Sequence, residues 1–274
     1  MNPLARRMFE LVEPIGVIPY AADDPNEAMF ALGFTDYWDT YFAGRAAPLG
    51  LVPADVVDAL FYNFAPGEVA RHIPKVWQTT TPAAALAARL RGCANALRRI
   101  LADHVDTPAF ARAAELLLQA GTSAPLEGRP MYAALRALPV PEGVVERVFH
   151  AASLLREHRG DGHIVALMSE GIGRLEAHVV FSLAMDLPAE KFGRIHHLPA
   201  AQLTAVIDGL RVRRIVGDDG WLTDHGRAVH GRVEALTDDL AVIPYESLSA
   251  GELDELATIL EPLAALLIAA QDFG

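Results

Sequence analysis

The sequence predicts a mainly α-helical protein built from two degenerate copies of one helical unit, the second followed by a small β-hairpin and C-terminal helices. Three observations support this fold class. Long stretches consist of good helix formers. Apolar residues within them recur at spacings of three and four. Similar residues also recur in the same order in the two halves of the chain.

Composition and proline mark the helical segments. Residues 83–90 and 144–155 are rich in alanine, leucine and arginine. Prolines stand where helices are expected to begin, a position that tolerates a missing amide proton; they are Pro53, Pro66, Pro82, Pro108, Pro188 and Pro199. Strand signals are few. The clearest is the pair of segments 214–216 and 221–223 around a Gly/Asp turn, which predicts a short hairpin.

The internal repeat is weak but ordered. Residues 55–73 match residues 178–195, and the match continues from 82–86 to 199–203. Prolines and glycine cluster between residues 125 and 145, which predicts an aromatic-rich N-terminal domain over 1–130 and a second domain over 131–274. Chance similarity between two segments rich in alanine, leucine and arginine is the alternative.

Composition and charge exclude several classes of protein. The 274 residues are 52% hydrophobic, enough for a substantial core. The longest stretch without a charged residue, 76–88, is too short to span a membrane, and the N-terminus lacks the features of a signal peptide. Cys93 has no second cysteine to pair with. These features predict a cytoplasmic protein. The net charge of −12 weighs against avid nucleic-acid binding, although residues 151–235 are nearly neutral.

The order of elements after Glu176 indicates a winged helix-turn-helix. Helices are expected at about 174–184, 188–195 and 199–211, followed by the hairpin and a long helix from about 223. In such a unit the third helix enters the DNA major groove and the hairpin forms the wing. The predicted DNA-binding residues are Gln202, Thr204, Arg211, Arg213 and Arg214. The wing tip carries Asp218 and Asp219, which phosphate would repel.

Two short motifs strengthen this interpretation. Residues 222–228 read Leu-Thr-x-x-Gly-Arg-Ala, and residues 248–253 read Leu-Ser-x-x-Glu-Leu. On these motifs the stretch 174–270 resembles the MarR-like winged-helix regulators, in which the first motif closes the wing and the second starts the last helix of the dimerisation region. Residues 42–50 and 155–163 are also similar to an uncharacterised actinobacterial group of helix-turn-helix proteins.

Two further regions could hold a small ligand. Residues 156–163 combine arginines, histidines and glycines, with Asp161 placed to orient an imidazole, although a capped helix end is the alternative. Nine aromatic residues lie between 34 and 77, either as a slot for a flat ligand or as a domain core. The predicted ligand-binding residues are Tyr41, Arg45, Tyr62, Asn63, Arg156, His158, Arg159 and His163. The histidine spacings do not place two rings on one helix face, so neither metal nor cofactor is predicted.

The resulting hypothesis is a ligand-responsive winged-helix transcriptional regulator with a pocket for a small apolar or aromatic molecule between its halves. Double-stranded DNA is the expected macromolecular partner, and no membrane is involved. One alternative is a small-molecule-binding or sequestering protein that no longer binds DNA, and a weaker one is a cofactor-free enzyme that uses the same pocket. The repeat predicts a monomer, because two copies of the unit would already lie in one chain.

Overall fold

The computed structural model describes residues 2–191 and 197–270, which are mostly helical. The N-terminal half contains α1 (Pro3–Gly16), α2 (Ile18–Ala21), α3 (Asp23–Phe30), α4 (Tyr37–Ala46), η1 (Ala47–Leu49), α5 (Ala54–Phe61), α6 (Glu68–His72), η2 (Lys75–Gln78), α7 (Pro82–Leu101), η3 (Ala102–Asp106) and α8 (Pro108–Ser123). The C-terminal half contains α9 (Pro130–Arg136), α10 (Val144–Ser169), α11 (Arg174–Ala184), η4 (Ala189–Lys191), α12 (Ala200–Val212), α13 (Asp224–Ala241), η6 (Ile243–Ser247) and α14 (Ala250–Ala270).

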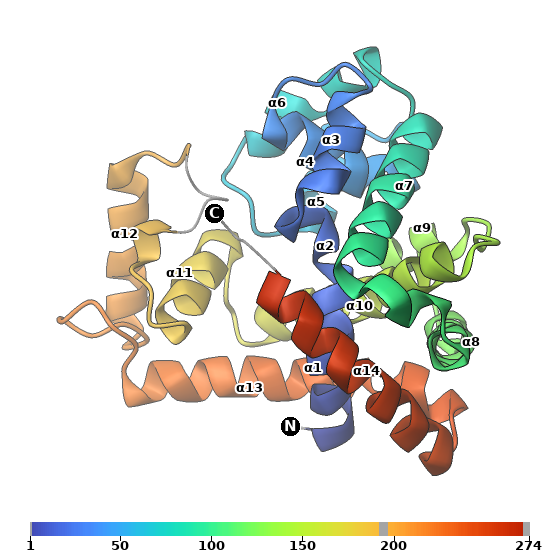
Figure 1. The fold of residues 1–274 in the computed structure, drawn as a ribbon. Coiled ribbons are helices and arrows are strands. Elements are labelled where there is room, and N and C mark those ends of the chain that lie inside the picture. Colours follow the sequence, from blue (N-terminus) through green and yellow to red (C-terminus); the bar gives the residue numbers. More distant parts are fainter. Residues whose placement is uncertain (1, 192–196, 271–274) are drawn as a thin grey trace.

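Helix α10 is the central element of the fold (Figure 1). It packs against α1, α7, α8, α9 and α13. The main core is formed there by fully buried side chains such as Leu97, Leu117 and Val148, to which α14 adds Leu260 from the far end of the chain. This core therefore joins residues from both sides of the predicted boundary at residue 130, and that boundary stays a prediction.

A second cluster is aromatic and lies among α4, α5, α6 and α7. Phe42, Phe61 and Phe64 are buried, and the imidazole of His72 stacks on Phe42 with ring centres 4.6 Å apart. These three phenylalanines therefore belong to the domain core and do not form a slot for a flat ligand.

The third cluster holds α11, α12 and α13 together as an arm on one side of the molecule (Figure 1). Buried Val179, Leu210, Ile215 and Val229 form its centre. Helix α13 continues from this arm to the main core, where it packs on α10 and α1. The predicted helices at 174–184 and 199–211 and the helix after residue 223 are confirmed. Of the segment expected at 188–195, residues 189–191 form η4 and residues 192–195 lie outside the described part of the chain.

The predicted β-hairpin is wrong. In the described residues no strand forms, and the segment contains a single isolated bridge between Val216 and Leu222. The reason is that its neighbours serve helix ends. The Ile215 amide returns to the Leu210 carbonyl at the end of α12, and the Thr223 side chain accepts the Gly226 amide at the start of α13. Two backbone hydrogen bonds still cross the turn, from the Gly217 amide to the Trp221 carbonyl and from the Thr223 amide to the Ile215 carbonyl. They flank the single bridge without forming a strand, so a β-hairpin wing is not shown.

The structure gives the internal repeat no support. The repeat pairs α7, a 20-residue helix with eight buried residues, with α12, a 13-residue helix in which only Leu210 is buried. A residue pattern that fits a core helix in one copy and an exposed helix in the other reflects shared composition, since alanine and leucine suit both. The repeat therefore stays an unconfirmed prediction.

Candidate functional site

Helix α12 is the most prominent feature of the arm because it is exposed along nearly its whole length. It forms the outer edge of the molecule (Figure 1). Gln202 and Thr204, predicted to contact base edges, are exposed near its N-terminal end. Helix α11 lies behind it and contacts it directly. This arrangement of a supporting helix and an exposed second helix is that of a helix-turn-helix.

The start of α13 explains the Leu-Thr-x-x-Gly-Arg-Ala motif. Leu222 is buried in the core of the arm, and Thr223 caps α13 through its hydroxyl. A side chain at Gly226 would clash with the backbone carbonyl of Ile215. Arg227 pairs with Asp224 at 2.6 Å. The motif therefore fixes the junction of α12 and α13 without a wing.

The second motif, Leu-Ser-x-x-Glu-Leu at residues 248–253, forms a capping box at the start of α14. The Ser249 amide donates to Glu252 Oε2 at 2.9 Å, and the Glu252 amide donates to Ser249 Oγ at 3.3 Å. The apolar face of α14 packs on α1, α7 and α8 of its own chain. The helix that the resemblance assigned to dimerisation is thus engaged within the chain.

The three arginines predicted to bind phosphate all lie at the C-terminal end of α12, but two are paired. Arg211 binds Asp208 at 2.8 Å, and Arg213 binds Glu176 at 2.9 Å. Within the described residues no acidic partner of Arg214 is found, and this residue is exposed. Because the two ion pairs are solvent-exposed, they are weak and can exchange their carboxylate for another anion.

Residues 156–163 lie inside α10, not at a helix end. The glycines at 160 and 162 were expected to terminate a helix, but α10 continues to Ser169. Gly162 instead makes room for the guanidinium of Arg129, which donates to the His158 carbonyl at 3.1 Å and the Leu240 carbonyl at 3.0 Å. Close approach, rather than termination, is what this glycine provides.

Asp161 does not orient an imidazole either. Its carboxylate accepts the amides of Met131 and Tyr132 at the start of α9. Burial raises the pKa of Asp161 to about 7. His158 is also buried and packs edge-on against Tyr132, and burial together with the Arg129 charge lowers its pKa to about 4. His158 is therefore a neutral core residue at physiological pH.

Arg159 and His163 face α13. The Arg159 guanidinium reaches Asp238 at 3.0 Å and Glu234 at 3.3 Å, and Arg6 of α1 binds the same two carboxylates. His163 Nδ1 lies 3.0 Å from the Thr237 hydroxyl. These residues connect α1, α10 and α13, so their contacts are structural.

Tyr41, Arg45 and Arg156 come together on the opposite side of α10. Glu157 joins them: Arg45 reaches one carboxylate oxygen at 3.5 Å and Arg156 the other at 3.3 Å. Arg45 also donates to the Tyr41 hydroxyl at 3.0 Å and stacks on Phe61. The structure therefore brings together three of the predicted ligand-binding residues, while their role in ligand binding stays a prediction.

Sequence reasoning missed two neighbours, Tyr20 and Arg89. Arg89 donates to the Gly44 carbonyl at 3.1 Å and lies 3.4 Å from the Tyr20 hydroxyl, and among the described residues it forms no ion pair. A depression with a free volume of about 20 Å³ opens here. Its lining includes Tyr20, Tyr37, Tyr41, Arg45 and Arg89. A cavity of this size holds about one water molecule, or one polar group of a ligand. Neither missed residue belongs to a motif, so only the fold reveals them.

Tyr62 and Asn63 lie elsewhere and bind the arm. The Tyr62 hydroxyl donates to the Ile172 carbonyl at 2.6 Å, and His178 Nε2 contacts the Asn63 carbonyl. The ion pair of Arg174 with Asp58 and the contact of His197 Nδ1 with Glu68 extend this row of contacts. The segment 58–68 thus docks the arm onto the aromatic cluster, which is a structural role that residue types alone did not indicate.

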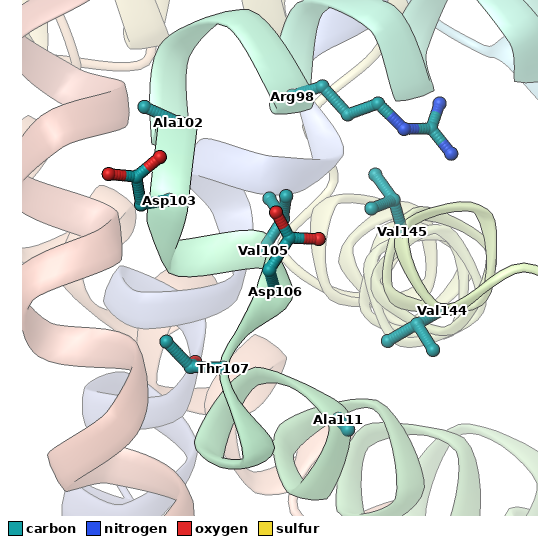
Figure 2. Close-up of a pocket in the computed structure, with 9 residues that line it drawn as sticks. All are labelled: Arg98, Ala102, Asp103, Val105, Asp106, Thr107, Ala111, Val144 and Val145. Atoms are coloured by element: carbon teal, nitrogen blue, oxygen red, sulfur yellow. The ribbon is translucent and has the colours of Figure 1, made fainter.

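A larger hollow of about 570 Å³ lies between η3, α8 and the start of α10 (Figure 2). Its polar side chains do not converge: Asp103 points away from Asp106, and Arg98 extends toward a third side (Figure 2). Arg98 is also paired with Glu146 at 2.7 Å. Specific ligand sites place a few polar groups around one point, which this hollow lacks.

Comparison with known proteins agrees with the arm's geometry. The model of a helix-turn-helix family matches residues 5–274, and the chain belongs to that family. Membership supports a DNA-binding regulator as the general class of function. No curated protein and no solved structure matches the chain. None of the described helices is long and apolar enough to cross a membrane.

Proposed function

We propose that the protein is a DNA-binding regulator that places α12 in the major groove and responds to a small ligand bound by its N-terminal half. The exposure of α12 carries this proposal. A helix of 13 residues with one buried residue contributes little to the protein's own core. Its position on α11, in a chain of the helix-turn-helix family, supports nucleic acid as the partner that covers it.

The roles of the arm's polar residues follow from their positions. Gln202 and Thr204 lie near the N-terminal end of α12, the end that reads base edges in this class of motif. Arg211, Arg213 and Arg214 would contact phosphates. Arg211 and Arg213 would exchange their exposed carboxylate partners for phosphate oxygens, and Arg214 needs no exchange.

A mobility-shift assay with the DNA upstream of the protein's own coding sequence, at low salt, tests the proposal. The triple variant Arg211→Ala/Arg213→Ala/Arg214→Ala should lose the shift. The matched control Arg91→Ala/Arg98→Ala/Arg99→Ala removes the same charge from α7 and should keep it. An equal shift in both triple variants would sink the assignment of α12, since it would show that the loss of three positive charges has the same effect at either place.

The ligand site is proposed at the depression lined by Tyr20, Tyr41, Arg45 and Arg89. Its support is the excess of positive charge: Arg45, Arg89 and Arg156 surround Glu157, and Glu13 neutralises Arg156 at 3.1 Å. The Nε atom of Arg45 is buried, and among the described residues no hydrogen-bond partner of it is found. The anionic group of a small aromatic or apolar molecule matches this charge, and the depression would have to widen to take the rest of the molecule. The docking row at 58–68 connects the site to the arm.

A second function is favoured by one observation, the pairing of the arm's arginines. Arg174, Arg211, Arg213, Arg227 and Arg232 all bind acidic side chains. Such pairing is expected of a protein that binds a ligand but not DNA. A protein of this kind would give no mobility shift with the upstream DNA at low salt while still binding its ligand.

We also propose that the protein is a monomer. The apolar face of α14, with Leu256, Leu260, Leu263 and Leu267, is buried within the chain. Light scattering should give a mass near 29.5 kDa. A stable dimer would contradict this proposal.

A further inference from the structure

Three metal-ligating side chains converge at the outer end of the aromatic cluster. Asp36 caps the N-terminus of α4, Asp39 lies in the first turn of that helix, and His72 is the last residue of α6. One possible ligand atom from each lies within 4.8 Å of the others. Asp39 and His72 are 7% exposed, whereas Asp36 faces solvent, so the group is open on one side.

The environment of His72 calls for a cation. Its Nδ1 lies 2.7 Å from Asp39 Oδ1, and its Nε2 lies 3.3 Å from Glu68 Oε1. A neutral imidazole carries one N–H, so one of these contacts would set a nitrogen lone pair against a carboxylate oxygen. Either a second proton on the ring or a metal ion beside Nδ1 removes this repulsion.

The surroundings supply further ligands for a metal ion. Asp36, which caps α4, offers a third donor on the Nδ1 side. The Nζ atom of Lys75, an exposed residue, already lies 2.7 Å from Asp39 Oδ2, which shows that this carboxylate binds a cation. A flexible surface lysine can swing away when an ion takes its place.

The orientation of the His72 ring is also fixed. It stacks on Phe42 at an interplanar angle of 13°, and the Glu68 carboxylate fixes its far nitrogen. A carboxylate that orients a histidine from behind is the usual outer support of a metal-bound imidazole. Arg71 at 3.4 Å and His197 at 2.7 Å in turn hold Glu68.

We propose that Asp36, Asp39 and His72 bind a divalent transition-metal ion, with Glu68 as the positioning residue behind His72. Two carboxylates and one imidazole suit Zn²⁺, Mn²⁺ or Fe²⁺ better than Mg²⁺, which prefers an all-oxygen shell. Bonds of about 2.1 Å place neighbouring donors about 3.0 to 3.4 Å apart, so the Asp39 oxygen and His72 Nδ1 need to separate by roughly half an ångström. Solvent completes the coordination on the Asp36 side.

The site lies next to the arm. Glu68 contacts His72 with one oxygen and His197 with the other, and His197 precedes α12 by three positions. An ion on His72 therefore acts on the same carboxylate that holds the start of the DNA-facing helix.

Titration calorimetry with Zn²⁺ and visible absorption with Co²⁺, both on the full chain, test the proposal. We expect one Zn²⁺ per chain and a cobalt spectrum with d–d bands. Asp36→Asn should weaken Zn²⁺ binding at least tenfold while preserving the cap, because asparagine also caps helices. Glu68→Gln should weaken it by about 10- to 100-fold and shift the cobalt bands. The control His104→Gln, on exposed η3, should bind as the native protein does.

His72→Gln should abolish binding at this site. Zn²⁺ binding that survives unchanged in both His72→Gln and Asp36→Asn would assign the ion to surface histidines and overturn the proposal. The absence of any saturable Zn²⁺ or Co²⁺ binding would overturn it as well. Neither outcome bears on DNA binding by α12.

Discussion

Arginine–carboxylate pairs occur in two contrasting settings in this protein. On α10 they are buried: Asp238, the partner of Arg159, is fully buried, and the pairs join elements far apart in the chain. On the arm they are exposed, as between Arg211 and Asp208, three residues apart on one helix. Both kinds of pair join an arginine to a carboxylate, but they differ in their exposure to solvent.

The difference separates structural from functional arginines. Removing one member of a buried pair leaves an uncompensated charge in a medium of low dielectric constant. Removing one member of an exposed pair changes little, because water replaces the partner. Buried pairs on α10 are therefore part of the fold, and exposed pairs on the arm remain available for another anion, such as DNA phosphate.

The largest expected effect is on stability. Arg159→Met should lower the free energy of unfolding by about 3 kcal/mol, because the fully buried Asp238 then keeps a single ion-pair partner among the described residues, Arg6. Arg213→Met should lower it by less than about 1 kcal/mol. Urea denaturation measures both. Equal losses in the two variants would remove the distinction between the two settings.

The junction of α12 and α13 comes next. Gly226→Ala should cost about 2 kcal/mol or more, because the new methyl group meets the Ile215 carbonyl. Gly231→Ala, in the same helix with open space around it, should stabilise by about 0.5–1 kcal/mol. Thermal denaturation of the two variants distinguishes the effect of the close contact at Gly226 from the effect of helix propensity. A neutral Gly226→Ala would mean that the arm tolerates a shift of α13.

The pH dependence of stability should reveal two titratable groups that contact α9 and have opposite effects on stability. His158 has a folded pKa of about 4 against 6.5 unperturbed, so its contribution is present above pH 6.5 and is lost as pH falls. Asp161 has a folded pKa of about 7 against 3.8, so its contribution is present at low pH and is lost as pH rises toward 7. The two should partly cancel between pH 4 and 6.5.

Single variants uncover each contribution. Asp161→Asn should lose stability more steeply than the native protein on acidification from pH 6.5 to 4. His158→Phe should lose stability as pH rises over the same range. Urea denaturation at several pH values measures this, and parallel curves for all three proteins would contradict the opposing shifts.

The smallest effect is expected at the turn before α13. Asp218 is exposed, and among the described residues no partner of its carboxylate is found, whereas Asp219 accepts the Trp221 amide at 3.0 Å. Asp218→Lys should therefore raise DNA affinity a few-fold, by about 1 kcal/mol, if the turn lies near phosphate. Asp103→Lys on η3 makes the same charge change far from α12. Equal gains in a mobility shift would place the turn away from DNA.

Local signals predicted the arm's helices well and its surroundings poorly. Thr223 and Ser249 are caps whose partners lie three residues away, so sequence alone reveals them. The hairpin prediction was wrong because pairing across the turn stops at one bridge, beyond which Ile215 and Thr223 also serve helix ends. The roles of Gly162 and Asp161 depend on Arg129 and on α9, some 30 residues away. Arg89 and Glu68 belong to no motif, and only tertiary packing brings them to their partners.

The central claim, that α12 faces DNA, is tested most directly by tethered cleavage. Cys93 is buried, and burial raises the pKa of its thiol to about 12, so an introduced cysteine can be labelled selectively with an iron chelate. Ala205→Cys on the exposed face of α12 and Leu126→Cys in the loop between α8 and α9 carry the label to two surfaces. We predict cleavage of bound upstream DNA from position 205 and none from position 126. Cleavage from position 126 alone, or equal weak cleavage from both, would contradict the account.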